Sequence, residues 1–228
     1  MKRADAADLA GSVAVGALAA FALLTLTVTG RDGSPLFGDE DLLEWSVGHR
    51  PHAMVAVARA LTSTGTGVVP YLLAALAGLL AGRTPRQRGT AVAAALLCLA
   101  AGQAVRSGVM TLVARPRPAP RDWVTHASGW AFPSGHTTTA AVAAGLLALA
   151  ILARARRGRA ALVALVLTWG VLVGLTRVYL GVHWFSDVLG GWLFALCWLS
   201  LCVYAAARLG PRTASGETER SCPPAAGH

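Results

Sequence analysis

Long stretches without a charged residue are the feature that most constrains this chain of 228 residues. Each reaches about 17 residues, the length that a helix needs to cross the hydrocarbon layer of a membrane. In lipid, backbone polar groups must be satisfied within the segment, so such runs predict helices. We therefore expect an all-α polytopic membrane protein with six transmembrane helices. The six runs are Leu9–Gly30, Ala60–Gly82, Gly89–Ala114 (interrupted by Arg106), Thr137–Ala153, Ala160–Thr176 and Val188–Ala207.

The composition excludes several other classes of protein. Hydrophobic residues make up 55% of the chain and charged residues 14%, whereas a soluble domain has about 25% charged residues. The net charge of +9 comes from arginines clustered between the apolar runs, which is typical of loops at a membrane surface and not of a nucleic-acid partner. The four cysteines have neither zinc-site spacing nor the pattern of a disulfide framework.

The arginine clusters also predict the orientation. They precede the first run, separate the second from the third and the fourth from the fifth, and follow the sixth. With six spans, these segments share one face, which the positive-inside rule makes cytoplasmic. We therefore expect residues 1–210 to form one transmembrane domain in the plasma membrane, followed by a disordered cytoplasmic tail at 211–228. The sequence indicates no oligomeric state.

The segment after the first run is expected on the outer face. Leu42, Leu43, Trp45 and Val47 alternate with acidic residues from Asp39 onward, which predicts a short amphipathic helix on the outer leaflet. Ala53–Leu61 fits either a second interfacial turn or an early start to the second span. The threonines and glycines at 62–67 are interpreted as small residues that allow close helix packing. His49, His52, His126 and His228 have no polar cluster around them and are expected to be solvated or interfacial.

Three polar clusters lie at the expected outer ends of the later spans. They are Arg115–Pro118, Pro133–His136 and Thr176–Asp187. Polar residues at membrane depth are costly and are therefore functional candidates. The predicted topology places all three clusters on the same face.

These clusters offer the groups needed for phosphoryl transfer. Guanidinium groups bind tetrahedral oxyanions, and a helix that begins near Ser134 and Gly135 presents free amides to an anion. His183 and Asp187 are four residues apart, so one helical turn brings them onto the same face. The carboxylate can then fix the tautomer of the imidazole and leave its other nitrogen free to attack. The clusters predict a phosphoryl-transfer site without metal ligands.

The three clusters resemble the signature motifs of the type 2 phosphatidic acid phosphatase (PAP2) superfamily of membrane lipid phosphatases. Pro133–His136 matches the second motif in full. Arg177, His183 and Asp187 match the third, with Thr176 where the family commonly has Ser. Arg117–Pro118 matches the end of the first motif, but Met110 occupies the position of its lysine.

The resemblance implies a role for each matching residue. His183 would attack phosphorus, Asp187 would orient it, and His136 would act as general acid and base. Arg117, Arg177, Ser134 and the Gly135 amide would hold the phosphate oxygens. Arg106 lies one helical turn before Met110 and is a candidate to replace the lysine, and Arg115 is a second candidate. No metal or other cofactor is implied.

The membrane setting favours a lipid substrate for an active site on the outer face. The candidates are phosphatidate, phosphatidylglycerol phosphate and a polyprenyl diphosphate such as the undecaprenyl carrier. Two alternatives remain open: a lipid phosphotransferase, and a protein that binds or flips lipid phosphates and has lost catalysis.

Overall fold

The computed structural model describes residues 3–154 and 157–209, and this part of the chain is all helical. The tail at 211–228, expected to be disordered, lies outside the described residues, as does His228. The described helices are α1 (Arg3–Thr29), α2 (Asp39–Gly48), α3 (His52–Ser63), α4 (Val68–Ala81), α5 (Pro85–Val113), the 3₁₀ turn η1 (Pro120–Asp122), α6 (Gly135–Arg154), α7 (Arg159–Tyr179) and α8 (Phe185–Leu209).

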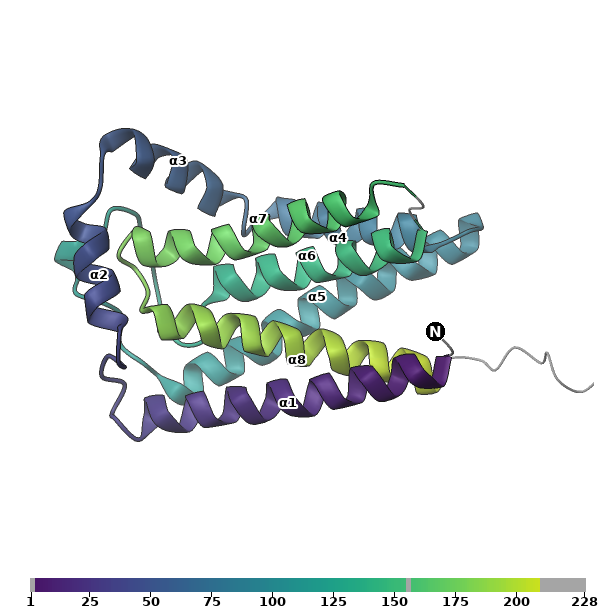
Figure 1. Cartoon of the computed structure of the whole chain (residues 1–228), viewed down its shortest axis with the longest axis horizontal. Helices are drawn as coiled ribbons and strands as arrows, with labels where there is room; N and C mark the ends of the chain where they lie inside the picture. The colour runs from purple at the N-terminus through teal and green to yellow at the C-terminus, as the bar shows by residue number, and fades with distance from the viewer. Residues whose placement is uncertain (1–2, 155–156, 210–228) are drawn as a thin grey trace, which may run out of the picture.

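The long helices run roughly along one direction, and α2 lies across one end of the bundle (Figure 1). The α5–α6 and α7–α8 connections, which carry the three polar clusters, lie at the same end as α2. The start of α1 and the end of α8 lie at the opposite end, where Arg208 Nη2 binds Asp8 Oδ1 at 2.6 Å. The predicted convergence of the three clusters at one end of the bundle is therefore confirmed.

The predicted spans match the observed helices except for the second. Five helices are long and apolar enough to cross a membrane, namely α1, α5, α6, α7 and α8. The run at 60–82 is not one continuous helix: α3 and α4 meet at an angle of 51° with a break at residues 64–67, and they make a sixth span only as a bent pair. Gly67, the residue before α4, has a φ of 66°, which a glycine adopts without strain. This non-helical conformation separates α4 from α3.

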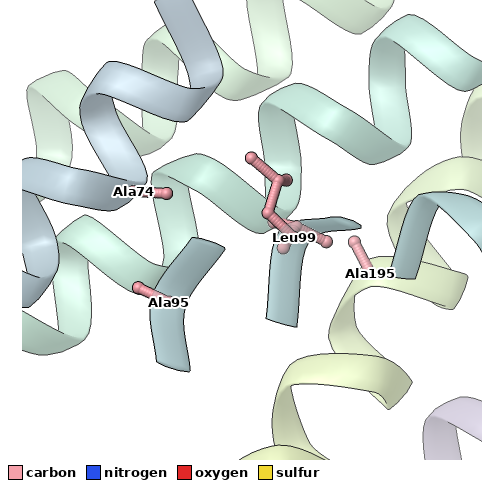
Figure 2. Close-up of a cluster of buried hydrophobic side chains, with 5 residues drawn as sticks. Ala74, Ala95, Leu99 and Ala195 are labelled. Atoms are coloured by element: carbon pink, nitrogen blue, oxygen red, sulfur yellow. The ribbon is translucent and has the colours of Figure 1, made fainter. Parts of the chain in front are cut away.

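Helix α6 is the central helix of the bundle. In the most apolar 18-residue stretch of α6, 61% of the residues are buried, whereas the corresponding share in the other four long helices is 17–33%. Small side chains allow the neighbours of α6 to approach closely. Figure 2 shows one such contact region, where Ala74 of α4, Ala95 and Leu99 of α5 and Ala195 of α8 come together. This packing holds the middle of α6, at Val142, against the neighbouring helices.

Helix α2 forms where the amphipathic pattern predicts it, and it buries a carboxylate as well as an apolar side chain against the bundle. Leu42, Trp45 and Val47 are exposed, whereas Asp39 and Leu43 are buried. The helix contacts α7 and α8 through this buried face. Asp39 is buried because a set of hydrogen bonds to its carboxylate, described below, outweighs the preference of a carboxylate for solvent.

Candidate active site

Six of the predicted site residues line one pocket of about 430 Å³ at the α2 end of the bundle. They come from α5, the α5–α6 connection, the start of α6, the end of α7 and the α7–α8 connection. They are Arg106, Arg117, Gly135, His136, Arg177 and His183. The residues lining the pocket include three arginines and no carboxylate, so the pocket favours an anion.

His183 lies in the connection between α7 and α8, where the chain turns at Gly181. Gly181 has a φ of 75°, and a Cβ at this position would overlap the backbone oxygen of Asp122, so only glycine fits. Asp187 lies in the first turn of α8, and its Oδ2 accepts a hydrogen bond from the Trp184 amide at 2.9 Å. This contact caps the helix and brings the same oxygen to 3.3 Å from His183 Nδ1.

The two nitrogens of His183 have different partners, and these determine the tautomer. Arg117 Nη1 is 2.8 Å from His183 Nε2 and can only donate, so Nε2 carries a lone pair. Nδ1 then carries the proton and donates to Asp187. Nε2, on the pocket side, is therefore the nitrogen able to attack an electrophile.

Arg117 is anchored by backbone carbonyl oxygens. Its Nε and Nη2 donate to the carbonyls of residues 128–130, and Nη1 also donates to Val182 O at 2.7 Å. Four of its five N–H groups are thus held by the backbone. The fifth is directed at His183 Nε2, so this N–H faces the nitrogen that lines the pocket.

The burial and charge around His183 keep its imidazole neutral. Its side chain is 1% exposed. Burial lowers its pKa well below the ordinary value, and the positive charges of Arg117 and Arg177 lower it further. Burial also lowers the pKa of Arg117, which nevertheless remains a cation at neutral pH. A neutral imidazole keeps the lone pair on Nε2 that a nucleophile needs, in a pocket that favours anions.

His136 lies in the first turn of α6, on another wall of the same pocket. Its Nε2 is 3.5 Å from Thr66 Oγ1. The N-terminal amides of α6 are unpaired within the helix, as at any helix start, and favour negative charge nearby. This wall therefore supplies an imidazole and an anion-binding helix end.

Arg177 and Arg106 complete the cationic lining. Arg177 Nη1 donates to Thr62 Oγ1 at 3.1 Å, and the Arg106 guanidinium lies against Gly135, where an added Cβ would be 3.3 Å from Cζ. Arg106 Nη1 is 3.1 Å from Met110 Sδ, so it occupies the place next to the missing motif lysine. The Nε atoms of Arg106 and Arg177 are buried without a hydrogen-bond partner, which leaves donors for a ligand.

Two residues predicted to bind phosphate lie behind the pocket instead of lining it. Ser134 is fully buried, and its hydroxyl accepts a hydrogen bond from Thr137 Oγ1 at 2.9 Å. Arg115 is also fully buried and forms ion pairs with Asp39 and Asp187. The alternation of Arg115 and Arg117 along the chain turns the first away from the pocket and the second into it.

Several pocket residues were not predicted from the sequence. Thr66, in the break between α3 and α4, lines the pocket near His136, and Thr62, near the end of α3, accepts a hydrogen bond from the pocket residue Arg177; both were interpreted as packing residues. Gln103 and His126 also line the pocket, although His126 was expected to be merely solvated or interfacial. The available signal was the presence of several hydroxyl groups at the end of an apolar run.

Fold and site together define a membrane-embedded helical protein with a buried histidine–aspartate pair facing an arginine-lined pocket. Residues 91–211, just over half of the chain, match the sequence model of the PAP2 superfamily. The chain belongs to the PAP2 superfamily.

Similar proteins from bacteria agree with this assignment. Phosphatidylglycerophosphatase B of Bacillus subtilis (strain 168) is 38% identical over 88 residues, which cover 36% of this chain and 40% of that protein. The protein of the same name from Escherichia coli (strain K12) is 37% identical over 94 residues, covering 41% of this chain and 36% of the relative. The chain thus spans about two fifths or less of the length of these curated relatives.

A solved structure supports the fold over a longer range. The crystal structure of a transmembrane PAP2-type phosphatidylglycerolphosphate phosphatase from Bacillus subtilis superposes with a TM-score of 0.71 at 22% sequence identity. The superposition covers 87% of this chain and 98% of that chain.

Proposed function

We propose that this protein hydrolyses a lipid phosphate at the outer face of the plasma membrane through a phosphohistidine intermediate. The observation that carries the proposal is the arrangement of His183 between Asp187 and Arg117, in a pocket that also holds His136. This arrangement supplies a nucleophile, a group that orients it, and a second imidazole for proton transfer.

In the first step, His183 Nε2 attacks phosphorus as the bond from phosphorus to the lipid oxygen breaks. His136, as imidazolium, gives its proton to the leaving oxygen. The Arg117 guanidinium must shift so that the N–H directed at Nε2 binds a phosphate oxygen instead, which frees the lone pair. Arg117, Arg177 and Arg106 stabilise the charge that develops on the equatorial oxygens.

In the second step, neutral His136 takes a proton from water, whose oxygen attacks phosphorus and breaks the bond to His183. Inorganic phosphate leaves, His183 is again neutral, and His136 is again protonated. Asp187 stabilises the positive charge on His183 while the phosphohistidine forms and breaks.

Phosphatidylglycerol phosphate is the preferred substrate in this proposal, because both curated relatives reported above are phosphatidylglycerophosphatases. Phosphatidate and a polyprenyl diphosphate offer the same terminal phosphate to the pocket. The arginine-rich connections support the outer-face location in this proposal, because they lie at the end of the bundle opposite to the pocket and the positive-inside rule favours the cytoplasm for them.

The decisive experiment offers these three lipids to the detergent-purified protein and measures inorganic phosphate. We expect release from at least one lipid, fastest from phosphatidylglycerol phosphate, in the presence of excess chelator. His183→Ala should reduce the rate to background. His52→Ala, which removes an exposed histidine outside the pocket, is the matched control and should keep the wild-type rate. Equal phosphate release by wild type and His183→Ala would refute the proposal.

In this proposal, Arg106 binds the phosphate in place of the missing motif lysine. Loss of a charged hydrogen bond costs about 1.5–3 kcal/mol, so Arg106→Ala should lower kcat/KM roughly tenfold or more. Met110→Lys in the Arg106→Ala background should restore much of the loss, because a lysine there reaches the same wall of the pocket. Arg88→Ala changes an exposed arginine near the other end of α5 and serves as the control. Unchanged turnover in Arg106→Ala would end the idea of replacement.

A further inference from the structure

We infer that Arg115 and Asp39 are positioning residues for this reaction: they hold Asp187 behind His183, and neither contacts the phosphate. The inference rests on the proposed function, since it concerns the aspartate that orients the nucleophile. Arg115 lies within the first motif but not at one of the positions matched above, and Asp39 lies outside the region that matches the family.

The hydrogen bonds of Arg115 leave no donor for a ligand. Nη1 donates to Asp187 Oδ1 at 2.6 Å and to Ser186 Oγ at 2.7 Å, and Nη2 donates to Asp39 Oδ2 at 3.0 Å. The two remaining N–H groups donate to backbone carbonyls of the α1–α2 connection, both at 3.1 Å. All five donors are used, and the side chain is fully buried.

Asp39 connects the start of α2 to the start of α8. Its Oδ1 accepts from the Ser186 amide at 2.8 Å, and its Oδ2 accepts from Ser186 Oγ at 2.5 Å. Asp39 Oδ2 also accepts from the Leu36 amide at 2.9 Å. Asp39 therefore holds the residue immediately before Asp187, as well as the arginine that binds Asp187.

The charges of this cluster match the needs of the proposed chemistry. Arg115 lies between the carboxylates of Asp39 and Asp187, so with both carboxylates ionised the buried cluster carries one net negative charge next to His183. This charge stabilises the positive charge that His183 acquires when it binds phosphorus. Without Asp39, the guanidinium would be compensated by Asp187 alone, and less negative charge would act on His183. Without Arg115, two carboxylates would be buried without a cation, which is strongly unfavourable.

The test measures kcat and KM for Asp39→Asn and Arg115→Lys with the lipid that the wild type hydrolyses fastest. We expect kcat to fall roughly tenfold to a hundredfold, the range typical of residues that support a reacting group, with KM changed less than about twofold. Asp41→Asn and Arg121→Gln are matched controls, because these residues are exposed and lie near the two positioning residues in the chain. Thermal unfolding in detergent shows which variants fold. If Arg115→Lys does not fold, Asp39→Asn still tests the inference.

A double-mutant cycle separates positioning from a general structural effect. If Arg115 acts through Asp187, Arg115→Lys should cost little further activity in an Asp187→Asn background. Additive losses would overturn the inference, as would a raised KM with unchanged kcat, which indicates that Arg115 binds phosphate. A wild type that releases no phosphate overturns the proposed function and this inference together. If the wild type is active and the variants raise KM without changing kcat, only this inference is overturned.

Discussion

At the scale of the residue, the two arginines of the Arg-Pro-Arg-Pro sequence have separate positions. Arg117 reaches the pocket and contacts His183, whereas Arg115 lies behind it and contacts Asp187. The sequence places both beside a phosphate site and cannot distinguish them, because the direction of a loop side chain depends on partners far along the chain. For Arg115, one of these partners is Asp39, which precedes it by 76 positions.

The buried neutral imidazole of His183 predicts a loss of stability in acid. Its folded pKa lies well below its unfolded value near 6.5, so the unfolded chain binds more protons below that pH. Its contribution is complete above about pH 6.5 and falls by about 1.4 kcal/mol per pH unit as the pH drops further. The charged groups that act on it are Arg117, Arg177, Arg106 and Asp187.

Thermal unfolding in detergent between pH 7.5 and 5.5 checks this prediction. The unfolding midpoint of wild type should fall more steeply on acidification than that of His183→Gln, which has no proton to gain at this position. His52→Gln, at an exposed position, should follow the wild type. Parallel curves for wild type and His183→Gln would contradict the assignment of a neutral buried imidazole.

At the scale of the element, the break between α3 and α4 brings hydroxyl groups to the pocket. Thr62 contacts Arg177, Thr64 accepts a hydrogen bond from Trp169 Nε1 at 2.9 Å, and Thr66 lies near His136. Hydropathy alone predicts one span here, because threonine and glycine do not interrupt an apolar run. The bend depends on Gly65 and Gly67 and on contacts with α7, which a local pattern does not contain.

Gly65→Ala should therefore disturb the pocket from a distance. A Cβ at residue 65 would overlap Val173 of α7, and overpacking of this kind costs about 1–3 kcal/mol. We expect a lower unfolding midpoint and a lower kcat/KM, because Thr62 and Thr66 move with the break. Val173→Ala in the same chain should restore both quantities by making room for the methyl group. Gly89→Ala, which meets open space on α5, is the control.

At the scale of the whole molecule, the sequence predicts the architecture well and the site in part. Charge-free runs predict the five long helices because lipid imposes the helix, and the motifs predict the meeting of His136 with His183. The parts that were not predicted are tertiary: the burial of Asp39, the direction of Arg115, and the entry of Thr66 into the pocket. Each depends on a partner in a different helix or connection.

The orientation of the bundle is open to a direct test by cysteine labelling. In a variant without the native cysteines, Glu44→Cys at the pocket end should react with a membrane-impermeant maleimide on intact cells. Arg86→Cys at the other end should react only after the membrane is opened. Both positions are exposed in the structure. The reverse pattern would place the pocket in the cytoplasm and overturn the proposed outer-face activity.

The contact between Asp39 and the first turn of α8 has a consequence for the smallest functional unit. A shortened protein beginning at residue 91 would retain Arg117, His136, His183 and Asp187, and would still match the family. It would lack the second carboxylate of Arg115 and the hydroxyl groups beside His136 and Arg177. The region that matches the family therefore lacks part of the site, because the first ninety residues supply Asp39 behind the pocket and Thr66 on one of its walls.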